Sequence, residues 1–273
     1  MALAYSPIIA AIFFVVGTLM RLVAFVRYIN RKHFDAYERQ DLRPSHIEKE
    51  WQYRRDESGL VATYNCLNAM AWVILAIPML QVAWALSRGG QRKVRTHGAI
   101  VGFALTGIIT ELISRLLSFG GKSSALWISS SFNLDVWLPQ GTYVESDKIG
   151  WRALEVTYLI ANGMTTFIDA FEWVCLSVIL VLIAYSVGSM QDRVFNVWWS
   201  RFGLLIAFLC VFDLVGAIVL LYDQHTYTLF AVSISVINML IFLPVWLTML
   251  AIQLPKALPT YVPARDMEPA FSQ

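Results

Sequence analysis

The stretch YLIANGMTTFIDAFEWVCLSVILVLIAYSV, residues 158–187, decides the fold class of this chain. A helix of this length rises about 1.5 Å per residue and so exceeds the roughly 30 Å hydrocarbon core of a bilayer. Its only formally charged side chains are Asp169 and Glu172. We therefore predict that residues 158–187 form a transmembrane helix that carries two acidic groups into the membrane.

Other apolar runs of similar length lie on both sides of this stretch. They are residues 7–27, 60–86, 97–118, 202–222 and 227–252. The composition agrees, because a chain with 58% hydrophobic and 15% charged residues has too few polar groups to cover a water-facing surface. We expect an all-α, polytopic transmembrane bundle of about six spans that forms a single domain over residues 1–254. The first run lacks a basic leader and a small-residue cleavage pattern, so we expect it to remain as an anchor.

The links between the runs differ in character. Residues 28–58 are charged and contain a capping box at Ser45 and Glu48, which predicts a surface helix. The link at 120–157 is too long for a turn, and its Trp-containing middle at 124–138 predicts an interfacial or re-entrant segment. Residues 255–273 are Pro-rich and predict an extended tail. The first link and the tail are the segments through which we expect protein partners to bind.

Basic residues indicate how the chain is oriented. Four of them crowd the link between the second and third runs, and Arg193 and Arg201 mark the link between the fourth and fifth. Positive charge favours the cytoplasmic side, so both termini are expected there. Arg27, Arg31 and Lys32 oppose this assignment, and the inverted orientation therefore stays open.

Charged side chains within the spans are the strongest functional signal, because each costs about 2.5–3.5 kcal/mol to insert. They are Arg21, Glu111, Arg115, Asp169, Glu172 and Asp213. With alternating helix directions, the first five fall in one half of the bilayer and Asp213 lies near its midplane. Asn65 and Asn68 fall in the same half. The sequence thus predicts a polar cluster facing an almost entirely apolar opposite half.

The spacing of these charges predicts how they pair. Glu111 and Arg115 are four residues apart in the favourable order for an ion pair on one helical face. Asp169 and Glu172 also share a face, and two carboxylates that close do not both ionise in a low-dielectric site without compensation. Arg21 or Arg115, a shared proton or a bound cation would supply it. We therefore take Glu111, Asp169, Glu172 and Asp213 as ligand- or ion-binding candidates, with the two arginines as charge partners.

Several features predict packing or exclude other functions. Gly98, Gly102 and Thr106 form a small-residue face typical of close helix packing, and Pro78 and Pro244 predict kinks. The histidines and the three cysteines show no metal-ligand spacing, so no metal site and no cofactor is expected. The formal net charge of +2 and the absence of a recognition motif argue against nucleic-acid binding.

Three functional classes are compatible with this pattern. The first is a transport or ligand-sensing bundle in which the acidic cluster binds a small ligand, a cation or protons. The second is a structural or assembly subunit whose polar cluster only holds the helices together. The third, which we rank last by a small margin, is a membrane-embedded enzyme that acts on a lipidic substrate through carboxyl general acid catalysis.

Overall fold

The computed structural model describes residues 5–31, 58–87, 92–131, 145–189, 195–219, 234 and 236–257, and these residues are almost entirely helical. The helices are α1 (Ser6–Arg31), α3 (Ser58–Ser87), α4 (Arg92–Ser131), α5 (Glu145–Gly188), α6 (Val197–Val219), the π-helical turn η3 (Asn238–Phe242) and α8 (Leu243–Ala257). No strand occurs among the described residues. The predicted all-α bundle is confirmed.

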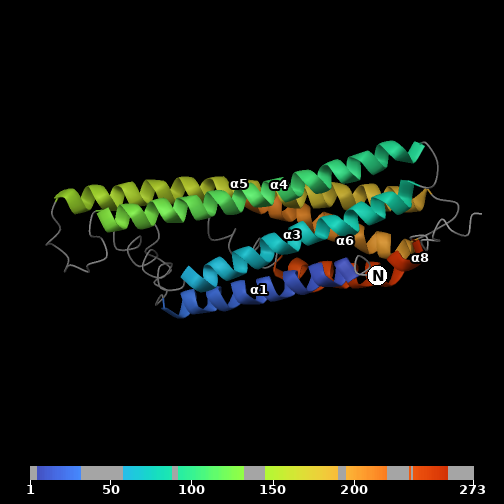
Figure 1. Cartoon of the computed structure of the whole chain (residues 1–273), viewed down its shortest axis with the longest axis horizontal. Helices are drawn as coiled ribbons and strands as arrows, with labels where there is room; N and C mark the ends of the chain where they lie inside the picture. The colour runs from blue at the N-terminus through green and yellow to red at the C-terminus, as the bar shows by residue number, and fades with distance from the viewer. Residues whose placement is uncertain are drawn as a thin grey trace, which may run out of the picture.

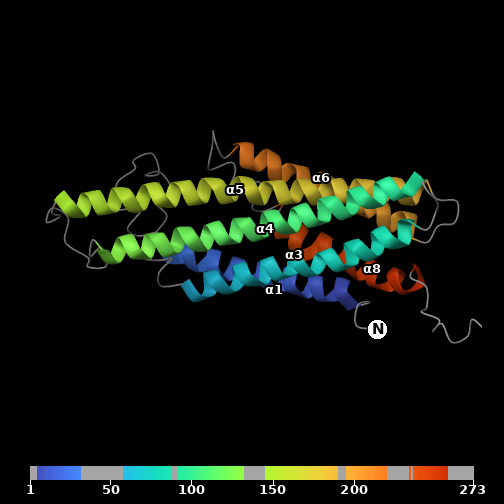
Figure 2. The ribbon, with the colours of Figure 1, turned by 45° about the horizontal axis from the view of Figure 1, so that its top comes forward.

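The helices lie side by side along one long axis (Figure 1). The most extensive contacts join α4 to α5, α1 to α3, and α5 to α6, while α3 also packs on α4 and α1 on α8. Figure 2 shows α4 and α5 running side by side and extending together past the ends of α1 and α3. The contact between α4 and α5 is therefore the longest seam in the bundle.

The described helices confirm a multi-pass membrane protein. Five of them contain stretches long and apolar enough to cross a bilayer: Ser6–Ala24, Ser58–Ser87, Arg95–Gly121, Ile168–Gly188 and Asn238–Ala257. The remaining predicted span, 202–222, corresponds to α6, whose described apolar stretch Val197–Phe212 is shorter. Large apolar side chains such as Ile12, Phe208 and Ile252 are more than half exposed, as expected for surfaces that lipid covers.

Helix ends depart from the predicted span limits. α4 continues to Ser131 and α5 already begins at Glu145, so much of the predicted link at 120–157 belongs to these two helices. The predicted interfacial or re-entrant segment at 124–138 thus begins as a continuation of α4, and its remainder lies outside the described residues. α8 ends at Ala257 and includes Pro255, which the sequence assigns to the tail. The predicted surface helix within 28–58 also lies outside the described residues.

Aromatic rings link three helices through the core. Phe14 of α1 meets Trp72 of α3 edge to face at 5.7 Å between ring centroids, and Trp72 meets Trp173 of α5 in the same way at 5.6 Å. Such pairs contribute about 0.5–1.5 kcal/mol each beyond their buried area. At the other side of the bundle, Trp199 of α6 stacks on Trp246 of α8 at 4.7 Å. These contacts fix the rotation of the helices about their own axes.

The π-helical turn η3 lies just before Pro244. Proline has no N–H and its ring collides with the carbonyl one turn earlier, so a local widening of the helix relieves both problems. The turn contains Asn238, which is fully buried and donates from Nδ2 to the sulfur of Cys210 at 3.5 Å. A π-helical turn thus precedes Pro244, the residue at which the sequence predicted a kink.

Glycines differ in what surrounds them. A Cβ atom added at Gly17 of α1 would collide with the Asn68 side chain and approach the Leu67 Cβ atom to 3.3 Å, so this glycine permits close contact between α1 and α3. A Cβ atom added at Gly98 or Gly102 would meet nothing within 4 Å. The predicted small-residue face on α4 is thus not packed against another part of the described chain.

We expect Gly17→Ala to destabilise the protein by about 1–3 kcal/mol, because the added methyl group overpacks the contact between α1 and α3. Gly102→Ala is the matched control and should be neutral or slightly stabilising, since alanine favours a helix by up to about 1 kcal/mol over glycine. Thermal unfolding of the purified variants in one detergent measures both. Equal stabilities for the two variants would contradict the close α1–α3 contact.

Candidate functional site

The seam between α4 and α5 brings three predicted acidic residues together. Glu111 lies on α4, and Asp169 and Glu172 lie one turn apart on α5. One carboxylate oxygen from each residue falls within 4.8 Å of the others. Glu111 is fully buried and Glu172 is 2% exposed. The sequence predicted their shared depth, and the structure shows that they also face one another.

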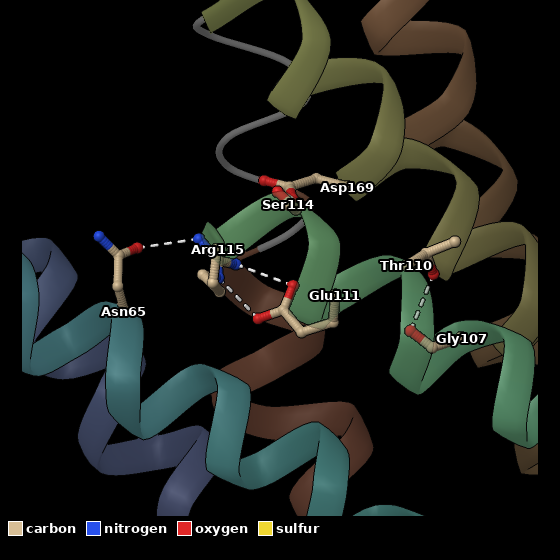
Figure 3. A network of polar contacts seen from close by, with 7 residues as sticks. All are labelled: Asn65, Gly107, Thr110, Glu111, Ser114, Arg115 and Asp169. Carbon is tan, nitrogen blue, oxygen red and sulfur yellow. Dashed lines mark hydrogen bonds and ion pairs between the residues drawn. The ribbon is translucent and has the colours of Figure 1, made fainter. Parts of the chain in front are cut away.

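Arg115 neutralises one member of the cluster. Its Nε atom donates to Glu111 Oε1 at 2.7 Å and its Nη2 atom donates to Glu111 Oε2 at 3.1 Å, as Figure 3 shows. This bidentate geometry confirms the predicted pair four residues apart on α4. Its Nη1 atom donates to Asn65 Oδ1 on α3 at 2.8 Å. The guanidinium group therefore joins α3 to the carboxylate cluster.

Ser114 supplies a hydrogen bond to a second member. Its hydroxyl group donates to Asp169 Oδ1 across the seam between α4 and α5 (Figure 3). Serine occupies the position next to Arg115 and one turn after Glu111, so residues 111, 114 and 115 share one face of α4. Asp169 is thus held by a neutral donor, which supplies no positive charge to the cluster.

Glu172 is the least satisfied member. Its Oε2 atom is buried and has no hydrogen-bond partner among the described residues. The indole N–H of Trp72 on α3 is likewise buried without a partner there. Unsatisfied buried polar groups cost about 1–3 kcal/mol each, and more when they are charged. Such groups persist where a bound species or a change of protonation uses them.

A small apolar cavity adjoins the cluster on one side. It measures about 10 Å³ and lies between α3, α4 and α5, where its walls include Trp72, Gly107 and Cys175. Gly107 is one turn before Glu111 and Cys175 is three residues after Glu172. The space is enough for about one water molecule. Beyond it, the three helices close with apolar side chains, as the sequence predicted for this half.

The remaining predicted site residues lie at the margin. Arg21 of α1 is exposed and makes no hydrogen bond with the described residues, although its charge acts on Asp169. Asp213 belongs to α6, but its side chain lies outside the described residues. Asn68 is buried, and its Oδ1 atom has no hydrogen-bond partner within the described chain. The cluster shown by the structure is therefore Glu111, Asp169 and Glu172 with Arg115, Ser114 and Asn65.

Sequence analysis missed one member of this site. Ser114 carries no charge, but its place on the same helical face as Glu111 and Arg115 could have identified it. Trp72, which lines the neighbouring cavity, also gave no signal, because an indole in an apolar run is usually a packing residue. Its position depends on the rotation of α3 against α5, which local spacing does not encode.

Comparison of the chain with protein-family models, curated proteins and solved structures finds no match. The function is therefore inferred from the chemistry of the cluster.

Removing the guanidinium group should unfold the site. Arg115→Gln leaves Glu111 buried without its cation, which typically costs about 3–5 kcal/mol. The double variant Glu111→Gln/Arg115→Gln should recover at least half of that loss, because neither charge then remains alone. Arg95→Gln, an exposed position on the same helix, should change stability by less than about 0.5 kcal/mol. Unfolding in detergent measures all three, and a double variant no more stable than Arg115→Gln would contradict the pairing.

Proposed function

We propose that this chain is a membrane protein of the transport or ligand-sensing class, and that its acidic cluster takes up a proton within the bilayer. The observation that carries the proposal is the charge imbalance at the seam. Three carboxyl groups meet there, and within the described part of the chain Glu111 alone is in direct contact with a guanidinium group. Full ionisation would leave two uncompensated negative charges, one on the partly buried Asp169 and one on the buried Glu172, and protonation is the least costly way to remove one.

A proton fits the cluster better than a metal ion. Both oxygens of Glu111 already accept hydrogen bonds from Arg115, which weakens them as metal ligands. Asp169 and Glu172 alone provide too few ligands for calcium or magnesium, which take six or more oxygens. The positive charge of Arg115 would also repel a metal ion bound next to it by these carboxyl groups. A proton needs only one oxygen, and Glu172 Oε2 has no other hydrogen-bond partner in the described chain.

The contacts of Arg115 and Glu172 differ in kind. Arg115 links Glu111 to Asn65 and so connects α4 to α3, which is the work expected of a structural polar network. Glu172 of α5 meets the carboxyl group of Glu111 on α4, but its Oε2 atom has no hydrogen-bond partner among the described residues, and the residue lies 2% exposed in the centre of the seam. A purely structural cluster would gain stability by replacing this carboxyl group with a neutral one.

The surroundings favour access from one side only. The cavity next to the cluster is about 10 Å³, and apolar residues continue past it toward the end of the bundle where α4 begins. This volume is far below the roughly 300 Å³ of the smallest ordinary ligand sites, so it offers no chamber for a lipidic substrate. In the predicted orientation the closed side is cytoplasmic and the cluster would exchange protons with the opposite compartment.

Neutral substitutions test whether the cluster binds a proton. We expect the protein in lipid vesicles to show a buried carboxyl group that titrates in infrared difference spectra, and Glu172→Gln or Asp169→Asn to remove that signal. Both variants should remain folded, and Glu172→Gln should be as stable as the wild type or more stable. Ser177→Ala, a buried polar position on α5 that donates to Ala207 of α6, is the control and should keep the titration.

Two outcomes would count against the proposal. If the wild type shows no titrating buried carboxyl group, the proposal that the cluster binds a proton is wrong. Unfolding of Glu172→Gln and Asp169→Asn, with Ser177→Ala intact, would favour the structural or assembly class. Where titration is found, a pH-sensitive dye enclosed in the vesicles separates transport, in which protons cross the bilayer, from sensing, in which they only bind.

A further inference from the structure

A second site lies at the end of the bundle where α6 begins and α8 ends. An open groove of about 670 Å³ separates the first turn of α6 from the last turns of α8. Its lining residues include Asn196, Trp198, Met249, Ile252, Gln253 and Lys256. None of these residues belongs to the carboxylate cluster, so the groove requires a separate explanation.

Polar contacts hold the two helix ends in place. The backbone N–H of Asn196 donates to Gln253 Oε1 at 2.7 Å, and Gln253 Nε2 donates to the Met249 carbonyl at 3.3 Å. Asn196 also caps α6, because its Oδ1 atom accepts from the backbone N–H of Trp198 at 2.8 Å. The floor of the groove is thus built from mutually bonded groups of both helices.

The charge of the groove is positive. Lys256 lines it from the last turn of α8, and no acidic side chain occurs among its lining residues. The guanidinium carbon of Arg201 lies 5.2 Å from the centre of the Trp198 ring, which places a second cation beside one wall. The N-terminus of α6 adds the positive end of a helix dipole. An anion is the complementary ligand.

The apolar part of the wall indicates what carries that anion. Trp198 is 70% exposed and Ile252 is 64% exposed, and both lie near the end of an apolar helix. Tryptophan beside basic residues at a helix end is typical of the membrane–water interface. A small soluble anion would leave these apolar surfaces uncovered, whereas a phospholipid can contact the basic residues with its phosphate and the apolar residues with its acyl chains.

We propose that this groove binds the headgroup of an anionic phospholipid. Lys256 and the start of α6 face the phosphate, Arg201 and Trp198 flank it, and the first segment of an acyl chain lies on Ile252 and Met249. In the predicted orientation the groove faces the cytoplasmic leaflet, where anionic lipids attract basic residues. The site is independent of proton uptake, so either proposal can fail alone.

Native mass spectrometry of the full chain in mixed micelles with equal phosphatidylglycerol and phosphatidylcholine tests the site. The wild type should bind phosphatidylglycerol preferentially. Lys256→Gln should weaken phosphatidylglycerol binding about fivefold, the effect of one basic residue near an anionic lipid, and leave phosphatidylcholine binding unchanged. Lys256→Arg should retain binding, which shows that the variants fold. Lys256→Gln/Arg201→Gln should lose more than Lys256→Gln alone.

Arg95→Gln is the matched control, because Arg95 is an exposed basic residue of α4 outside the groove. An equal loss for Arg95→Gln would mean diffuse charge attraction and overturn the proposal. Full competition by inorganic phosphate would assign the groove to a soluble anion instead. A several-fold gain of lipid binding in Asp266→Asn/Glu268→Gln would assign it to the chain's own C-terminal segment, and either result would also overturn it.

Discussion

Three carboxyl groups and one bonded guanidinium group share the buried seam between α4 and α5, and this unequal pairing is the constraint around which the bundle is organised. The pair Glu111 and Arg115 removes one negative charge, and Asn65 extends the network to α3. The surrounding helices must exclude water while keeping these groups in contact. Edge-to-face packing of Phe14, Trp72 and Trp173 contributes to this, because it joins α1, α3 and α5 through a contiguous aromatic contact.

Polar groups in this protein are used in two different ways. At the seam Glu111 and Glu172 are buried, where an unpaired charge is costly, and the proposed uptake of a proton would remove one such charge. At the end of α6 and α8, Lys256 lines an open groove and Arg201 lies beside its Trp198 wall, and the proposed lipid site would use these two charges. The first arrangement suits a group that changes its protonation, and the second suits a lipid that exchanges freely.

The limits of the helices show where sequence reasoning ends. The length of each apolar run predicted the centre of a span. A segment within lipid must satisfy its own backbone N–H and C=O groups, and a helix does so. Run length did not mark the helix ends, since α4 and α5 continue past the apolar runs to Ser131 and back to Glu145. Polar residues can prolong a helix beyond the bilayer, and hydropathy does not register that. Similarly, Pro255 suggested an extended tail, yet it lies in the last turn of α8.

The sequence alone determined that the chain is an all-α membrane bundle, that Glu111, Asp169 and Glu172 lie at a similar level along their helices, and that Glu111 pairs with Arg115. These properties depend on run length and on spacing within one helix, which are local. Only the tertiary structure decided that Glu111 faces Asp169 and Glu172, that Ser114 binds Asp169, and that Arg21 stays exposed. Each depends on how a helix is rotated about its axis, and side-chain packing between distant segments sets that rotation.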